Sequence, residues 1–200
     1  MSRIALLGGS FNPPHVAHQM AVLWLLGSGR ADRIWLVPCF HHPLGKALAP
    51  FEDRFRMCEL ALLPFAAGRL EVSRVEQELG GDSRTLFTIQ RLIEQHPDLR
   101  FSLVIGADIL AEKESWYQFD EIERMVDLIV VGRGGYPAPP ICAASSRSAP
   151  QGREERKSIV LPDVSSTEIR RRIRAGQPVD HLVPEAVRVY IEELGLYRGS

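Results

Sequence analysis

Residues 3–18 read Arg-Ile-Ala-Leu-Leu-Gly-Gly-Ser-Phe-Asn-Pro-Pro-His-Val-Ala-His. The continuous apolar run over residues 4–7 predicts a buried strand of a parallel sheet. Gly8 and Gly9 end this strand and let another molecule approach the backbone closely. A strand, a glycine turn and a helix start in succession aim main-chain N–H groups at an anion. This stretch therefore predicts a phosphate site at a strand–helix junction of an α/β fold.

The helix of this unit is expected to begin at Pro13 and Pro14, because proline is tolerated in a first helical turn. Beyond them, Met20, Leu23 and Trp24 recur at helical spacing.

His15 and His18 lie three residues apart and would share one face of that helix. Imidazoles beside a helix N-terminus suit a polyphosphate, because they can be neutral or charged near pH 7. A metal site is the alternative for such a pair, but no third ligand lies nearby in sequence and cysteine is sparse. The pattern therefore favours phosphate.

The composition bounds the class of protein. The 200 residues fit one α/β domain with a sizeable core, so a single domain over residues 1–200 is expected. The net charge of −1 favours neither nucleic acid nor a membrane surface, and no apolar run has the length of a transmembrane helix. The chain enters its first strand at once, so no signal peptide is expected. The three unclustered cysteines fit a reducing cytoplasm. The sequence does not decide between a monomer and a homo-oligomer.

The rest of the chain alternates strand patterns with helix patterns, which predicts a doubly wound parallel sheet. The apolar runs that predict strands cover residues 33–37, 70–72, 101–105, 127–131 and 159–161. The segments that predict helices cover residues 51–63, 85 to before Pro97, part of 109–116, 120–125, a stretch opening at 164–170, and 185–194.

Two of these segments carry further expectations. In the helix over residues 51–63, an apolar stripe is expected to face inward and the charged residues mostly to face water. The stripe is Phe55, Cys58 and Leu62, and the charged residues are Glu52, Asp53, Arg54 and Arg56. Residues 132–157 are rich in Gly, Pro, Ala, Ser and Arg, which predicts a mobile loop inside the single domain.

A second anion site is predicted where the helix near residue 165 begins. Ser165 and Glu168 have the spacing of a capping box. Hydroxyl and N–H groups at this helix start can bind phosphate oxygens, and Arg170, one turn further, can add a charged fork. A capped helix with a solvated basic face is the alternative, and the residue pattern alone does not separate the two.

Both predicted sites resemble motifs of one superfamily. Residues 8–18 resemble the G-G-[ST]-F-[DN]-P-x-H-x-[GA]-H signature of nucleotidyltransferases, with Asn12 and Ala17 as mild variants. Residues 164–170 resemble the I-S-S-T-x-I-R motif of the same proteins. Matching segments run in family order from residue 4 to residue 197, and within the superfamily they resemble bacterial nicotinate-nucleotide adenylyltransferases most. The resemblance implies a Rossmann-like nucleotidyltransferase fold.

The resemblance also implies residue roles. The residues implied in catalysis are His15, His18, Lys46 and Arg170. Those implied in ATP binding are Gly8, Gly9, Ser10, Phe11, Gly106, Asp108, Arg133, Ser166 and Thr167. Those implied in binding the nicotinate nucleotide are Asn12, Arg84, Thr85, Trp116 and Tyr117. Without the resemblance, Lys46 would be a solvated surface lysine, Asp108 the N-cap of the next helix, and the aromatic pair a piece of core or rim.

The implied reaction is adenylyl transfer from ATP to nicotinate mononucleotide, which gives nicotinate adenine dinucleotide and pyrophosphate for NAD biosynthesis. Mg²⁺ is expected to accompany ATP, with no dedicated protein metal site. Nicotinamide mononucleotide, phosphopantetheine and FMN remain alternative acceptors. A nucleotide-binding module without turnover is a further alternative. A truncated class I aminoacyl-tRNA synthetase core is disfavoured, because a second lysine-rich signature and a basic charge are missing.

Overall fold

The computed structural model describes residues 1–62, 64, 68–133 and 159–199. Its centre is a six-stranded sheet with the order β3-β2-β1-β4-β5-β6, and every neighbouring pair is parallel. The strands are β1 (Arg3–Gly9), β2 (Arg33–Pro38), β3 (Leu70–Val72), β4 (Arg100–Gly106), β5 (Asp127–Arg133) and β6 (Val160–Leu161). The predicted doubly wound parallel sheet is confirmed.

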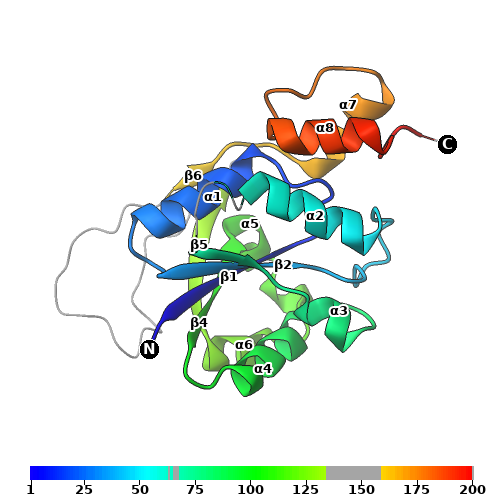
Figure 1. The fold of residues 1–200 in the computed structure, drawn as a ribbon. Coiled ribbons are helices and arrows are strands. Elements are labelled where there is room, and N and C mark those ends of the chain that lie inside the picture. The colour runs from blue at the N-terminus through cyan, green and yellow to red at the C-terminus, as the bar shows by residue number, and fades with distance from the viewer. Residues whose placement is uncertain (63, 65–67, 134–158, 200) are drawn as a thin grey trace.

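Helices cover both faces of this sheet (Figure 1). Those on one face are α1 (Val16–Gly27), α2 (Phe51–Leu62), α7 (Ser166–Arg174) and α8 (Glu185–Glu193). Those on the other face are α3 (Val75–Leu79), α4 (Thr85–Gln95) and α6 (Phe119–Met125). The short α5 (Ala107–Ala111) and the 3₁₀ turn η2 (Lys113–Ser115) follow β4.

The strands read as continuous apolar runs because both of their faces are buried. Successive side chains point to opposite faces, so one strand feeds two cores. In β1, Ala5 and Leu7 pack with α1, α2, α7 and α8, whereas Ile4 and Leu6 pack with α3, α4 and α6.

The order of the strands creates a crevice position at the carboxyl edge of the sheet. From β1 the chain runs outward through β2 and β3, then returns to β4 on the other side of β1 and continues to β5 and β6. Open α/β sheets bind ligands at such a reversal point, outside the carboxyl ends of the strands. Here that edge is formed by Gly9 of β1 and Gly106 of β4, with Pro38 and Val131 in register beside them.

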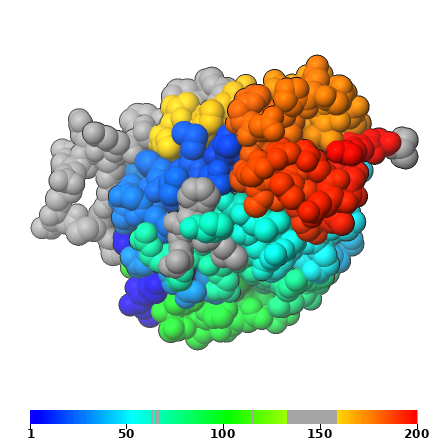
Figure 2. Space-filling view, turned by 45° about the horizontal axis from the view of Figure 1, so that its top comes forward, coloured from blue at the N-terminus to red at the C-terminus, as the bar shows by residue number. Residues whose placement is uncertain are grey.

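The C-terminal segment packs onto the side of the molecule that carries α1 and α2. In Figure 2, the orange and red residues of α7 and α8 lie against blue and cyan residues from the first third of the chain. The Tyr190 hydroxyl donates a hydrogen bond of 2.9 Å to Asp53 Oδ1, which ties α8 to α2.

The first helix differs from its prediction at its start and at its buried face. Helix α1 begins at Val16, not at the two prolines, because His15 is extended (φ −146°, ψ 175°) and serves as the N-cap. Met20 and Leu23 are 41% and 48% exposed, so the predicted apolar stripe is not the packed one. The buried side chains of α1 are Ala17, Ala21, Val22 and Leu25, and Trp24 packs against the same core while partly buried.

Three other predictions need correction. Arg54 was expected to face water, but it is 1% exposed. Asp108 is not the N-cap of the helix after β4; Gly106 is. Residues 132 and 133 complete β5, and the remainder of the predicted mobile loop lies outside the described residues. Helix α3 was not predicted, because five residues are too few to display a helical period.

Candidate active site

The backbone at the end of β1 is open to a ligand. Gly8 is exposed, and a Cβ built there would meet no protein atom within 4 Å. A Cβ on Gly9 would reach the Phe11 ring at 3.5 Å, an ordinary contact, and both glycines have a negative φ. Internal packing therefore does not require glycine here, and the open main chain leaves room for a phosphate to approach.

The histidine pair lies next to Phe11, whose ring is also the nearest neighbour of a Cβ built on Gly9. The His15 main-chain N–H donates to His18 Nδ1 over 3.1 Å, and the ring centroids are 3.9 Å apart. His15 is 4% exposed and His18 is half-buried against Phe11, with ring centroids 4.9 Å apart. The pair shares a capping turn, not a helix face. Because Nδ1 accepts a hydrogen bond, neutral His18 carries its proton on Nε2 and can donate it to an anion.

The second predicted anion segment begins with a capped helix. Ser165 is the N-cap of α7, and its Oγ accepts the Glu168 N–H over 3.2 Å. The Glu168 carboxylate turns outward to Arg171 and Arg172. The predicted cap at Ser165 is confirmed, but the predicted capping box is only half formed, because the Glu168 carboxylate accepts from Arg171 and Arg172 instead of the Ser165 N–H.

Two side chains of α7 grip the loop that follows β1. Ser166 Oγ donates to the Pro13 carbonyl over 2.8 Å, and Arg170 Nη1 donates to the Asn12 carbonyl over 2.7 Å. The other guanidinium nitrogen, Nη2, lies 3.4 Å from Thr167 Oγ1. Burial lowers the pKa of Arg170, followed by smaller effects of Tyr197, which raises it, and Arg174, which lowers it. The two motifs, about 150 residues apart, thus form one site.

Asn12 stabilises this loop from inside. Its side chain is 2% exposed, and Oδ1 accepts the Ala49 N–H over 3.1 Å and the Tyr197 hydroxyl over 2.9 Å. The C-terminal tail and the segment before α2 are therefore both tied to this loop over residues 10–14, which is called the phosphate loop here after its predicted ligand. Because both hydrogen bonds lie within the protein, the Asn12 side-chain oxygen is engaged there and is not directed at a nicotinate nucleotide.

Of the residues expected to bind the acceptor, Arg84, Thr85 and Tyr117 lie together at the start of α4. Arg84 is the N-cap of α4 and Thr85 its first residue. The Arg84 guanidinium lies 4.7 Å from the centroid of the Tyr117 ring, and the Phe87 ring lies 5.7 Å from it. Both aromatic rings are more than two-fifths exposed, which leaves a cationic and aromatic surface open to a ligand.

Trp116 plays a different part from its neighbour. Its half-buried ring packs edge-on against Phe119 with centroids 5.8 Å apart, and it joins the core of α3, α4 and α6.

The other expected ATP contacts lie on the same edge of the sheet. A Cβ on Gly106 would come within 2.1 Å of Asp108 Oδ1, so the carboxylate folds back over this glycine. Arg133 is the last residue of β5, and its side chain lies outside the described part of the chain. Lys46 is exposed between β2 and α2, close to His42, whose pKa is lowered by burial first and by Lys46 second.

Sequence reasoning missed Arg54. Its side chain donates to the carbonyl oxygens of Ser10, Cys39, Phe40 and Ala49, at distances between 2.8 and 3.2 Å. The signal was present, because Arg54 lies four residues before Cys58 and eight before Leu62, on the buried stripe of α2. The charge of arginine favours a solvated position, whereas the helical spacing of Arg54 with Cys58 and Leu62 favours burial, and the spacing is what the structure follows.

Within the described ranges, no group of three or more His, Cys, Asp and Glu side chains could hold a metal ion. No helix in those ranges is long and apolar enough to span a membrane.

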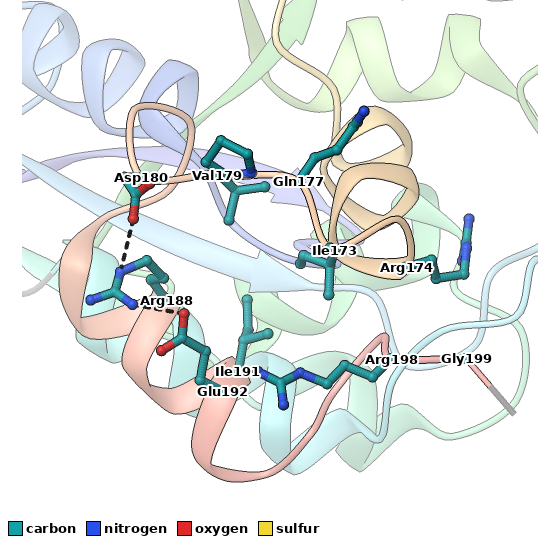
Figure 3. Close-up of a pocket in the computed structure, with 12 residues that line it drawn as sticks. Ile173, Arg174, Gln177, Val179, Asp180, Arg188, Ile191, Glu192, Arg198 and Gly199 are labelled. Atoms are coloured by element: carbon teal, nitrogen blue, oxygen red, sulfur yellow. Dashed lines mark hydrogen bonds and ion pairs between the residues drawn. The ribbon is translucent and has the colours of Figure 1, made fainter.

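A separate pocket of about 650 Å³ opens between α7, α8 and the C-terminal tail (Figure 3). On its wall, Arg188 is paired with Asp180 and Glu192. Ile173 and Arg174 place the pocket at the far end of α7 from the helix start that grips the phosphate loop.

Comparison with known proteins identifies the family. The cytidylyltransferase-like family model matches residues 6–172. Proteins named probable nicotinate-nucleotide adenylyltransferase from Anaeromyxobacter dehalogenans strain 2CP-1 and Myxococcus xanthus are 49% and 42% identical. Each alignment covers 98% of this chain, with 97% and 94% of the relative. Plasmodium falciparum nicotinic acid mononucleotide adenylyltransferase, complexed with NaAD, shares the fold with a TM-score of 0.78, 19% identity and 98% coverage of both chains. This chain belongs to the nicotinate-nucleotide adenylyltransferase family of cytidylyltransferase-like proteins.

Proposed function

We propose that this protein transfers the adenylyl group of ATP to nicotinate mononucleotide. An oxygen of the mononucleotide 5′-phosphate attacks the α-phosphorus of ATP, and the bond from that phosphorus to the bridging oxygen of the β-phosphate breaks. The products are nicotinate adenine dinucleotide and pyrophosphate. A phosphate is already a nucleophile, so the reaction needs no covalent enzyme intermediate. Catalysis then depends on positioning and on stabilising charge.

The observation that carries the proposal is the docking of α7 onto the loop after β1. Arg170 reaches the Asn12 carbonyl at 2.7 Å, which brings its guanidinium beside the turn that holds His15 and His18. These groups would donate to the α-phosphate and the leaving pyrophosphate. The exposed hydroxyl of Thr167 and the N–H groups at the start of α7 would add donors to the same phosphates.

The rest of the ATP site would lie along the carboxyl edge of the sheet. The open backbone at Gly8 and Gly9 would cradle the phosphates, and the Asp108 carboxylate beside Gly106 would accept from ribose hydroxyls. Lys46 would reach the phosphates from its exposed loop once ATP is bound.

The acceptor would sit on the surface formed by Arg84, Thr85 and Tyr117. A pyridinium ring can stack on Tyr117. The nicotinate carboxylate can pair with the Arg84 guanidinium, which lies over the Tyr117 ring. This pairing favours the acid over the amide.

Mg²⁺ would enter as part of the substrate MgATP. The ion would be held mostly by ATP oxygens and water. The ion would neutralise charge on the triphosphate. We also propose a cytoplasmic location, because Cys39 and Cys58 are free thiols, as expected in a reducing compartment.

The proposal is tested by comparing binding with turnover. ATP binding is measured by calorimetry, and pyrophosphate release is measured with ATP, Mg²⁺ and nicotinate mononucleotide. We expect both binding and release. ATP binding without pyrophosphate release would instead identify a nucleotide-binding module. This requires that release is absent with nicotinate mononucleotide, nicotinamide mononucleotide, phosphopantetheine and FMN alike.

A further inference from the structure

Arg54 occupies the junction between the two halves of the proposed site. Its guanidinium is buried, and each of its four hydrogen bonds ends on a main-chain carbonyl. A buried cation normally serves a carboxylate or a ligand. Here it serves backbone groups that come from three separate segments, so its role is to hold those segments in register.

The first two segments extend from the carboxyl ends of β1 and β2. Arg54 Nη1 donates both to the Ser10 carbonyl, over 3.0 Å, and to the Cys39 carbonyl, over 2.8 Å. Ser10 belongs to the loop that would cradle the ATP phosphates. One nitrogen therefore fixes the phosphate loop against the segment that follows β2.

The second set of contacts reaches the acceptor side. Arg54 Nη2 donates to the Phe40 carbonyl over 3.2 Å, and the Phe40 N–H donates to Ser83 Oγ over 2.8 Å. Ser83 directly precedes Arg84 and Thr85, the proposed acceptor residues. A short path of hydrogen bonds thus runs from the phosphate loop through Arg54 and Phe40 to the acceptor segment.

The remaining contact anchors the Lys46 loop. Arg54 Nε donates to the Ala49 carbonyl over 2.9 Å, so the loop over residues 41–48 is held by the same side chain at both of its ends. The Ala49 N–H in turn donates to Asn12 Oδ1, which ties that end back to the phosphate loop.

We propose that Arg54 is a positioning residue that sets the distance and angle between the bound ATP and the acceptor phosphate. This inference rests on the proposed adenylyl transfer. Each substrate would still bind to its own half of the site without Arg54, but the in-line alignment of the two would loosen. A displacement of about 1 Å can cost about a hundredfold in rate.

The test uses Arg54→Lys and Arg54→Met, with Met57→Ala as the matched control. Met57 is fully buried on the same helix and packs in the core, so its truncation destabilises the protein and leaves the hydrogen bonds of Arg54 to both loops in place. The assay is pyrophosphate release, below the unfolding temperature of every variant. We expect kcat to fall about 30-fold or more in Arg54→Met and less in Arg54→Lys, with KM for both substrates changed less than about threefold. Met57→Ala should keep its kcat. A kcat in Arg54→Met equal to that of Met57→Ala would overturn the proposal.

Hydrogen exchange gives a second readout that does not depend on turnover. In Arg54→Lys, the peptides that contain the Phe40 and Ala49 amides should exchange faster than in the wild type, whereas those from β1 should keep their protection. Unchanged exchange in the loop peptides would contradict the positioning role even if the wild type proved inactive. Inactivity of the wild type with changed exchange would instead reject the proposed reaction and leave the role of Arg54 in place. If Arg54→Met does not fold, Arg54→Lys and the exchange data decide.

Discussion

His18 is the side chain whose chemistry follows most directly from its surroundings. The His15 N–H donates to Nδ1, so the proton of the neutral His18 ring lies on Nε2, from which it can be donated to a phosphate. Replacing His18 by Ala removes this donor and puts a small apolar side chain at the same half-buried position in the first turn of α1. Pyrophosphate release should fall about 100-fold or more, the usual effect of losing one preorganised donor to a developing charge. Near-normal turnover in a variant with an unchanged circular dichroism spectrum would remove His18 from the mechanism.

Arg84 should govern the choice between acid and amide. A charge-assisted pair with the nicotinate carboxylate is worth about 1.5–3 kcal/mol, so Arg84→Gln should lower kcat/KM for nicotinate mononucleotide by about tenfold or more. The value for nicotinamide mononucleotide should stay the same. Arg91→Gln is the control, because it removes the same charge from an exposed position on the same helix. Equal losses with both acceptors would assign Arg84 to packing on Tyr117.

At this scale the sequence predicts side chains that follow a motif and misses those that act through the interior. His15 and His18 could be singled out because their spacing has a chemical meaning, and Ser166 and Arg170 because their segment resembles a motif of the superfamily. The structure brings the two pairs together. For Arg54 the helical spacing favours the buried stripe of α2, but its role could not be predicted, because arginine is most often solvated and its four acceptors are carbonyls scattered along the chain.

At the scale of elements, the cap of α7 holds the second anion segment in shape. Ser165 Oγ satisfies the Glu168 N–H, which is otherwise left without an intrahelical partner. Ser165→Ala should lower the free energy of unfolding by about 1 kcal/mol, and Ser165→Asp should retain it because aspartate caps equally well. Urea denaturation measures both, and a stable alanine variant would show that docking on the phosphate loop alone maintains the helix start.

The C-terminal tail adds a pH dependence. Burial raises the pKa of Tyr197 above its ordinary value of 10, with a smaller opposing effect of Arg170. Folding therefore favours the neutral phenol, whose contribution is complete below pH 10 and is lost as the pH rises toward the raised pKa. Between pH 10 and about pH 11 the wild type should lose about 1 kcal/mol more of its free energy of unfolding than Tyr197→Phe. Parallel alkaline denaturation curves would mean that the hydroxyl is solvated.

Elements could be predicted where one physical signal dominates. Strands are predictable where an apolar run bounded by Gly or Pro has few other interpretations, and β2 begins at the predicted Arg33 and ends at Pro38. The start of α1 was placed too early, because the choice between a proline first turn and a histidine cap depends on which main-chain N–H finds an acceptor. That acceptor, His18 Nδ1, is visible only in three dimensions.

For the whole molecule, alternation of strands and helices predicts the layers but not the strand order. The position of β4 beside β1 places Gly106 next to the phosphate loop, and no local pattern specifies that neighbour. The single domain over residues 1–200 stays a prediction, since residues 134–158 lie outside the described part of the structure.

Side-by-side pyrophosphate release tests the central claim, adenylyl transfer to nicotinate mononucleotide. Wild-type protein with ATP and Mg²⁺ is given nicotinate mononucleotide, nicotinamide mononucleotide, phosphopantetheine or FMN in parallel, and the dinucleotide product is identified by mass. The account predicts fast release with nicotinate mononucleotide and slower release with its amide. Silence with the nicotinate form, while another acceptor supports release, would contradict it.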